Sequence, residues 1–420
     1  MLSYRRILIA AVLLLLFLKL AVVFFQKDQI GVWEDDVIAR NMLETGKMFF
    51  MQRGTPNYMF QFPVYPSLLF VTYKIFGYDP LHAIVLNLVI ISLTCFFLYT
   101  IFIEVCRLQD VKLKRVRSEL IALISVFAFL LHPFIAYYSM FKVHPFVVDM
   151  FFPVLIIFLY VKYLQLPSWK NFGLLAFSSG FGILNRATAF VALLPFFILG
   201  VKFLGVRKIM LNLVLVFSVA ALVISPWLVR SYGLYNMLAM TMTGNEILWK
   251  GSLYNSDGSA YLLDGRTYES ALSKEEDQFL HGKSITIQNE FFKNKYSQLL
   301  REYPQHVFKI YFMKLKNFWF YHKNIGVEYG ERIQSFLVAY KIYIFFILGL
   351  NVGAVFLLKY KPLVLLSYPI GLCLVQSIFY VEARHRMIVE PFLLFFGILT
   401  VFVLSELNIH VNGKENNEPF

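Results

Sequence analysis

Charged residues are scarce in this sequence of 420 amino acids. Asp, Glu, Lys and Arg together make up 15% of the chain, whereas a typical soluble domain carries about 25%. Hydrophobic residues account for 59%, and the mean hydropathy is +0.64. This composition excludes an ordinary water-soluble protein and predicts an integral membrane protein.

Cysteine is also rare. The three cysteines, Cys95, Cys106 and Cys373, lie in or beside apolar runs and lack the spacing of metal ligands. A disulfide framework needs paired cysteines, and a structural zinc site needs closely spaced ones. The sequence therefore predicts neither, and we expect the thiols to pack in the protein or face lipid.

Nucleotide-binding motifs are missing as well. The chain contains no G-x-x-x-x-G-K-[ST] and no G-x-G-x-x-G, which argues against a nucleotide-driven pump and a Rossmann-type nucleotide-sugar domain. The net charge of +13 does not indicate a nucleic-acid partner, because Lys and Arg lie mostly in short loops between apolar runs. That distribution is typical of membrane topology.

Long apolar runs predict an all-α polytopic membrane protein of about ten transmembrane helices, since a helix needs roughly 20 apolar residues to cross the hydrocarbon. The runs lie near residues 7–25, 81–104, 119–138, 144–164, 170–185, 187–203, 209–229, 337–358, 362–380 and 386–406. The fifth and sixth are nearly continuous across Asn185 and Arg186. An alternative for them is a broken pair that only partly re-enters the membrane.

Loop charges predict the orientation. Arg5 and Arg6 precede the first run, which is long and lacks a cleavage pattern, so we expect a retained helix with a cytoplasmic N-terminus. Every loop that this choice assigns to the cytoplasm is basic. These loops carry Arg107, Lys112, Lys114, Arg115, Arg117, Lys162, Lys170, Lys202, Arg207, Lys208, Lys359 and Lys361. The C-terminus is then cytoplasmic too, in a multi-pass protein of the cell membrane.

Two long loops fall on the extracytoplasmic side and divide the chain. We expect an N-terminal transmembrane module over 1–230 with a catalytic first outer loop at 26–80, an extracytoplasmic region over 231–336, and C-terminal transmembrane helices over 337–410. Asp36 to Phe50 and Pro304 to Phe320 have the apolar, aromatic or basic pattern of interfacial helices. Ser273 and Glu276 have the spacing of a capping box.

The first outer loop contains three adjacent acids, Glu34, Asp35 and Asp36. One interpretation is a helix start, where acids complement the unsatisfied amides. The other is a general base or cation site, because adjacent carboxylates repel one another and raise a pKa. Arg40 follows Asp36 by four residues, a spacing at which a simple surface ion pair forms.

Further polar residues are predicted on the same side. Lys142 and His144 lie in the short loop before the fourth span, and Asp149 lies one turn into it, where an acid normally faces the bundle interior. Arginines also occur there against the usual charge bias: Arg186, Arg230, Arg384 and Arg386, with Glu382 nearby. Snorkelling to lipid headgroups is one explanation. A site for phosphate or pyrophosphate is the other, because guanidinium groups bind such anions bidentately.

At this point the sequence resembles the GT-C superfamily of membrane glycosyltransferases, close to glycosyltransferase family 39 and its relatives, the protein O-mannosyltransferases and lipid A aminoarabinose transferases. The matching segments are Trp33 to Gly46, Phe62 to Pro66, His132 to Pro145, Asn185-Arg186, Pro226 to Arg230, Thr243-Gly244 and Glu382 to Pro391. The resemblance implies a GT-C-type bundle with interfacial helices and extracytoplasmic loops.

The resemblance also implies a reaction. Asp35 or Asp36 would deprotonate the acceptor hydroxyl, and the donor would be a sugar on a polyprenyl phosphate, transferred with inversion. A lipid phosphate is a good leaving group, so the site needs cations more than a general acid. The expected donor-binding residues are Arg40, Lys142, His144, Arg186, Arg230, Arg384 and Arg386, supported by Glu34, Asp149 and Glu382.

The resemblance leaves several points open. The acceptor would be an envelope glycan, lipid or protein. No cofactor is certain, and a divalent metal ion near the carboxylates and His144 is an option. Relatives often carry an acid where His144 stands, so His144 or Asp149 takes that role or the role is missing. The sequence Lys250-Gly251-Ser252 also replaces a common Gly-Asn pair. Rival hypotheses are a transporter or flippase, a polysaccharide ligase or polymerase, and a non-enzymatic sugar-lipid binding protein.

Overall fold

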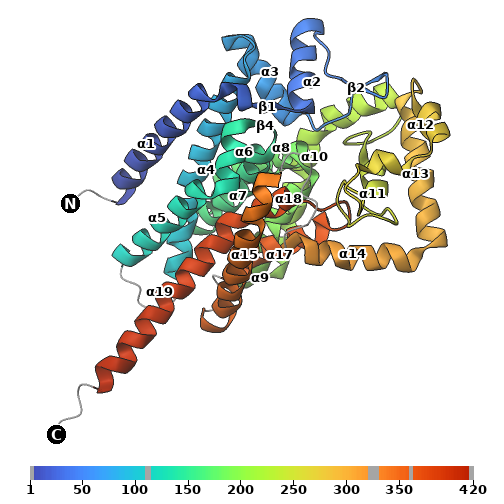
Figure 1. Ribbon diagram of the computed structural model, residues 1–420. Helices are drawn as coiled ribbons and strands as arrows, with labels where there is room; N and C mark the ends of the chain where they lie inside the picture. The colour runs from blue at the N-terminus through green and yellow to red at the C-terminus, as the bar shows by residue number, and fades with distance from the viewer. Residues whose placement is uncertain (1–3, 109–114, 320–330, 359–362, 416–420) are drawn as a thin grey trace.

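The computed structural model describes residues 4–108, 115–319, 331–358 and 363–415. The described chain forms a bundle of long helices with a set of shorter helices beside one end (Figure 1). The bundle elements are α1 (Tyr4–Phe25), α4 (Pro80–Leu108), α5 (Arg115–Leu131), α6 (Pro133–Phe141), α7 (Phe146–Gln165), α8 (Trp169–Asn185), η2 (Ala187–Leu193), α9 (Leu194–Leu204), α10 (Val206–Tyr235), α15 (Glu331–Leu357), η4 (Val364–Leu366), α17 (Ser367–Gln376), α18 (Ala383–Met387) and α19 (Glu390–Glu415).

Shorter elements occupy the two long loops. The first loop contains η1 (Lys27–Gln29), β1 (Gly31–Val32), α2 (Glu34–Thr45), β2 (Phe50–Gln52), β3 (Thr55–Asn57) and α3 (Val64–Phe76), and β4 (Lys142–Val143) follows α6. Residues 236–319, here called the loop module, contain α11 (Gly244–Lys250), η3 (Tyr268–Ala271), α12 (Lys274–Leu280), α13 (Ile285–Glu302) and α14 (Pro304–Trp319).

The structure confirms a polytopic helical membrane protein, with fewer spans by length and composition than the ten predicted. In the described part of the chain, six helices are long and apolar enough to cross a membrane. They are Tyr4–Phe25, Pro80–Arg107, Phe146–Gln165, Ala187–Leu204, Val206–Tyr235 and Val338–Leu357. The predicted spans at 170–185 and 362–380 correspond to shorter helices, α8 and the segment Val364–Gln376. The predicted span at 386–406 corresponds to α19.

The predicted span at 119–138 is a bent pair. Arg117–Leu131 and Pro133–Phe141 meet at an angle of 56° and would make a seventh span if counted together. His132 stands at the break in an extended conformation, and Pro133 opens α6. This follows from the proline ring, which disfavours helical geometry in the residue before it but suits the first position of a helix.

The fifth and sixth predicted spans are also separate elements. Arg186 has φ −157° and ψ 122°, which ends α8 at Asn185 and lets η2 begin at Ala187. A single extended residue therefore breaks the nearly continuous apolar run. As a result, the Arg186 side chain projects from a helix end rather than from the middle of a span.

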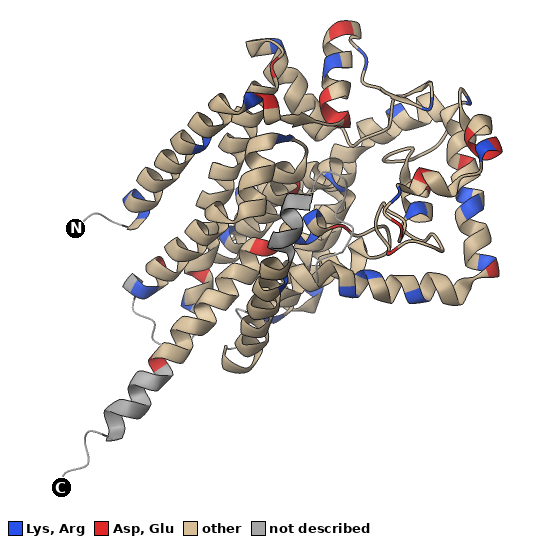
Figure 2. Cartoon of the chain, viewed as in Figure 1, with Lys and Arg blue, Asp and Glu red and all other residues tan. Residues whose placement is uncertain are grey.

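The start of α1 and the end of α19 lie away from α2 and α3 (Figure 1). Figure 2 shows that charged residues gather at helix ends and on the loop module, while long stretches of the bundle carry none. Of the predicted cytoplasmic cations, Lys112, Lys114, Lys359 and Lys361 lie outside the described residues.

A short pair of parallel strands, β1 and β4, joins two loops near the start of α2. Gly31 pairs with Lys142 and Val32 with Val143, so β1 and β4 bring the first long loop against the turn before α7. The residues that follow these strands, Trp33 and His144, have ring centroids 6.2 Å apart. This pairing places the acidic start of α2 beside the start of α7.

The helix predicted over 36–50 begins earlier, so all three acids lie in its first turn. Glu34, Asp35 and Asp36 favour this position because the N-terminus of a helix carries partial positive charge. None of them serves as the N-cap, which is Trp33 without a side-chain cap bond. The helix ends at Gly46, whose φ of 71° belongs to the left-handed region that glycine tolerates.

The loop module has its own small core. Trp249, Leu253, Leu262, Leu280 and Phe292 are buried together. The predicted capping box is present: Ser273 Oγ accepts from the amide of Glu276, and the Glu276 carboxylate accepts from the amide of Ser273. The helix predicted from Pro304 is α14, described to Trp319.

Candidate active site

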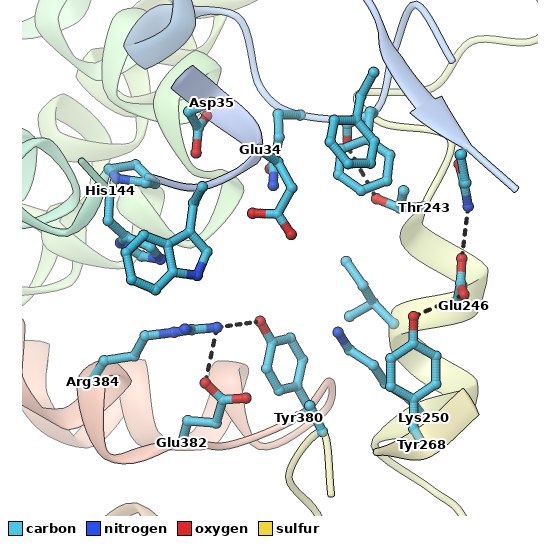
Figure 3. A pocket seen from close by; sticks show the side chains of 18 of the residues that line it. Glu34, Asp35, His144, Thr243, Glu246, Lys250, Tyr268, Tyr380, Glu382 and Arg384 are labelled. Carbon is cyan, nitrogen blue, oxygen red and sulfur yellow. Dashed lines mark hydrogen bonds and ion pairs between the residues drawn. The ribbon is translucent and has the colours of Figure 1, made fainter. Parts of the chain in front are cut away.

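A cavity of about 590 Å³ lies between the end of the bundle that carries α2 and the loop module. Separate parts of the sequence form its walls, chiefly the start of α2, the segment from Phe50 to Arg53, the turn around His144, α11 with the loop that follows, and the segment from Tyr380 to His385. Figure 3 shows these walls facing one another across an open centre. The cavity therefore exists only in the folded chain.

Asp35 faces this cavity from the first turn of α2. The residue is only 3% exposed. Burial raises the pKa of its carboxyl well above the ordinary value, and the negative charges of Glu34 and Asp149 raise it further. A carboxyl group in this state binds a proton more tightly than usual, so its ionised form is a stronger base than an ordinary carboxylate.

Asp36 points elsewhere and does not line the cavity. Tyr73 donates a hydrogen bond to its Oδ1 at 2.6 Å, while Tyr78 and Arg40 donate to Oδ2 at 3.2 and 3.0 Å. Both carboxylate oxygens are thus occupied, and the bond from Tyr73 ties α2 to α3. Arg40 serves this contact and does not line the cavity either.

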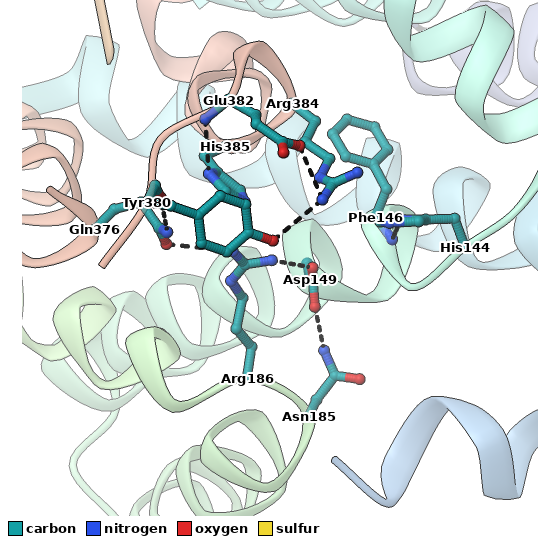
Figure 4. Close-up of polar contacts among 10 residues, drawn as sticks. All are labelled: His144, Phe146, Asp149, Asn185, Arg186, Gln376, Tyr380, Glu382, Arg384 and His385. Atoms are coloured by element: carbon teal, nitrogen blue, oxygen red, sulfur yellow. Dashed lines mark hydrogen bonds and ion pairs between the residues drawn. The ribbon is translucent and has the colours of Figure 1, made fainter. Parts of the chain in front are cut away.

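Arg384 forms the opposite wall. It extends from α18, and its guanidinium donates to Glu382 at 2.8 Å and to the hydroxyl of Tyr380 at 3.2 Å (Figure 4). Lys250 of α11 completes this side: its ammonium lies 4.0 Å from the centroid of the Tyr380 ring and 5.1 Å from that of Tyr268. Two cations from distant parts of the sequence therefore share one aromatic partner.

A third cation, Arg186, enters from the break after α8. Its guanidinium donates to Asp149 at 2.6 Å and to the side-chain oxygen of Gln376 at 3.2 Å. Asn185 donates to the other oxygen of Asp149 at 2.8 Å (Figure 4). Asp149 is therefore a partner that orients Arg186 rather than a second base facing the cavity.

His144 lines the cavity as a neutral ring. Burial lowers its pKa well below the ordinary value, and the charges of Arg384 and Arg186 lower it further. Its Nδ1 accepts a hydrogen bond from the amide of Phe146 at 3.1 Å. The ring proton consequently lies on Nε2, which makes that nitrogen a hydrogen-bond donor.

The remaining predicted residues lie outside the cavity. Lys142 is buried behind Trp33, with its ammonium 4.0 Å from the centroid of that ring. Arg230 donates to the carbonyl of Met48 at 3.3 Å. Arg386 points into the bundle, where it forms an ion pair with Glu390 at 2.6 Å. Of the predicted site residues, the cavity is lined by Glu34, Asp35, His144, Arg186, Glu382 and Arg384.

Several residues that line the cavity were not predicted as site residues. Lys250 and Tyr380 had no predicted role, and neither did Arg53, which forms an ion pair with Glu246 on the far wall. Gly251 accounts for this close approach. A Cβ atom there would overlap the backbone carbonyl of Phe379, lying 2.7 Å from its carbon atom, so only glycine lets α11 approach this segment so closely.

The part of the chain that the structure describes contains no preformed metal-binding site. The described residues include no group of three or more His, Cys, Asp or Glu side chains arranged to hold an ion. The cavity does contain Glu34 and Asp35 near His144. An ion bound there would need ligands from a substrate as well.

Comparisons with known proteins give one likeness. No protein-family model matches the chain, and no curated protein matches its sequence. Among solved structures, the chain is similar to the crystal structure of ArnT from Cupriavidus metallidurans bound to undecaprenyl phosphate, with 14% sequence identity and a TM-score of 0.41. The likeness covers 95% of this chain and 78% of that one.

Proposed function

We propose that this protein is a GT-C-type membrane glycosyltransferase that moves a sugar from a polyprenyl-phosphate donor to an extracytoplasmic acceptor. The observation that carries the proposal is the opposition, in one cavity, of a buried carboxyl and a wall of cations: Asp35 on one side, and Arg384, Arg186 and Lys250 on the other. The order of sequence motifs that resemble this superfamily supports the same function.

In this reaction Asp35 accepts the proton of the acceptor hydroxyl. The hydroxyl oxygen attacks the anomeric carbon of the donor sugar, and the bond from that carbon to the phosphate oxygen breaks with its electron pair leaving on the phosphate. The raised pKa of Asp35 suits this role, because a base works best when its pKa approaches the working pH. A single displacement inverts the anomeric centre.

The cations stabilise the charge that develops on the leaving phosphate. Arg384 and Arg186 are already held by Glu382 and Asp149, so their positions are fixed before the donor binds. Lys250 is held by aromatic rings and keeps its ammonium in the cavity. The Nε2 proton of His144 supplies one further donor that carries no charge.

The decisive experiment measures sugar transfer in membranes with a panel of radiolabelled polyprenyl-phosphate sugars. Asp35→Asn is expected to lower the transfer rate by about 10²–10⁴-fold, which is the usual contribution of a general base, while donor binding is retained. Asp36→Asn is the matched control, because Asp36 lies next in sequence but holds α3 instead of facing the cavity. Its expected defect is lower thermal stability with near-normal transfer per folded molecule.

Undiminished transfer by Asp35→Asn would remove the catalytic assignment. Donor binding without turnover in the wild type would favour a transporter, a flippase or a non-enzymatic binding protein. A polysaccharide ligase or polymerase would instead prefer diphosphate-linked donors, so the panel includes both linkages. Repeating the assay with EDTA and then with added Mg²⁺ or Mn²⁺ tests the option of a divalent ion.

A further inference from the structure

A second cavity, of about 410 Å³, opens within the loop module. The seven-residue helix α11 contributes to both cavities: Glu246 and Lys250 line the active-site cavity, and Trp249 lines the second one. The helix thus forms a shared wall between them. Nothing in the proposed transfer reaction uses the second cavity.

The second cavity has an apolar floor and a polar rim. Trp249, Leu253 and Leu262 form the floor and are almost fully buried. One face of α13 supplies much of the rim, because Lys295, Gln298 and Glu302 are spaced three to seven residues apart and lie on one side of a helix. A ligand that fits must combine an apolar surface with hydrogen-bonding edges.

Two exposed tyrosines line this cavity. Tyr254 is 65% exposed and Tyr303 is 50% exposed, although both are large aromatic residues. Their ring centroids are 6.0 Å apart, with an interplanar angle of 68°. Tyr254 also stacks on His306 at 4.7 Å, which fixes the ring before any ligand arrives and lowers the entropy cost of binding.

The two cations of the rim already pair with acidic side chains. Arg266 forms an ion pair with Asp264 at 2.7 Å, and Lys295 pairs with Glu276. Glu302 accepts a hydrogen bond from Gln298 at 3.0 Å. Acidic groups thus outnumber the cations around this rim, which disfavours a phosphate, so the fitting ligand is polar but uncharged.

We propose that the second cavity binds a neutral oligosaccharide segment of the acceptor. A sugar ring has an apolar face of C–H bonds, which stacks on the flat face of an aromatic ring, and hydroxyl groups at its edge, which bond to amide and carboxylate side chains. This inference rests on the proposed transferase function in naming the ligand as acceptor. A helix with its side chains is about 10–12 Å wide, so a chain that passes from this cavity around α11 to Asp35 contains more than one sugar.

The test uses the full-length protein in lipid nanodiscs and saturation-transfer difference NMR. The probes are neutral oligosaccharides of glucose, mannose, galactose or N-acetylglucosamine, from disaccharide to hexasaccharide. At least one series is expected to bind saturably, with affinity that increases with chain length. Tyr254→Ala combined with Tyr303→Ala is expected to weaken binding by about tenfold, because both stacking faces are lost.

Tyr254→Phe combined with Tyr303→Phe is the matched control, since it keeps both rings and is expected to bind nearly as the wild type does. Asp35→Asn is expected to bind the oligosaccharide normally even though it transfers sugar far more slowly, so failure of the transferase proposal and failure of this one are separable. The absence of saturable binding across the panel, or equal binding by the double-alanine variant, would overturn the proposal.

Discussion

Arg384 and Arg386 are two residues apart, yet they belong to two different environments. Arg384 faces the active-site cavity beside Glu382 and Tyr380. Arg386 is 2% exposed and points into the bundle, where it pairs with Glu390 and donates to the hydroxyl of Tyr340. The comparison teaches that a charged residue near the site has either a chemical role or a structural one, depending on which side of a short helix it occupies.

The largest effect is expected from Arg386→Ala. This change leaves Glu390 buried without its cation, and breaking a buried ion pair destabilises a protein by about 3–5 kcal/mol. Thermal unfolding of the purified protein in detergent measures the loss. The double variant Arg386→Met with Glu390→Gln is the control and is expected to recover part of the stability. A variant of normal stability that transfers no sugar would break the comparison, because it would give Arg386 a chemical role.

Arg384→Ala is expected to have a smaller effect, which falls on the rate of sugar transfer and not on stability. Removing one group that stabilises developing charge lowers the rate by about 10²-fold, while the unfolding temperature changes little because the side chain faces a cavity. Transfer kinetics and thermal unfolding are measured on the same preparation. Arg384→Lys keeps the charge but loses the bidentate geometry of a guanidinium group. Its transfer rate is therefore expected to lie between those of the wild type and Arg384→Ala. Loss of folding in Arg384→Ala would contradict the comparison, because it would give Arg384 a structural role.

The smallest effect concerns pH. Transfer requires ionised Asp35, so kcat/KM is expected to fall as pH decreases through the raised pKa of this carboxyl, above the value of about 3.9 for an ordinary Asp. The negative charge of Glu34 contributes to that raised pKa. Glu34→Gln therefore lowers it, and the acidic limb of the profile moves to lower pH by a fraction of a unit. A limb that stays in place or moves upward would exclude Asp35 as the titrating base.

Much of the architecture could be predicted from residue order. Apolar runs indicated the membrane helices, and the capping box at Ser273 and Glu276 was confirmed in detail. The break between the fifth and sixth runs at Arg186 was also predicted. The span count could not be derived in this way, because Pro133 bends one run by 56° and because α8 and the segment Val364–Gln376 are short helices. A bend at a single residue does not alter a hydropathy average, so the average gives no warning of it.

The sequence predicted which types of residue form the candidate site, but not which individual residues line the cavity. The acids and arginines were recognisable as unusual at a membrane surface, whereas Lys250 and Tyr380 carried no signal stronger than that of any loop residue. Their proximity depends on Gly251, which lets α11 lie against the backbone at Tyr380. Such contacts between distant segments are properties of packing.

The sequence by itself determined that this is a membrane protein and that its acids and arginines in unexpected positions gather near one side of the bundle. It also determined that three adjacent acids, Glu34 to Asp36, lie in the first long loop. Only the tertiary structure decided between neighbours, selecting Asp35 over Asp36 and Arg384 over Arg386 for the cavity. The physical reason is helical geometry. Successive residues in a helix point about 100° apart, so residues with equal chemistry in a sequence are assigned to solvent, cavity or core by the elements that pack around them.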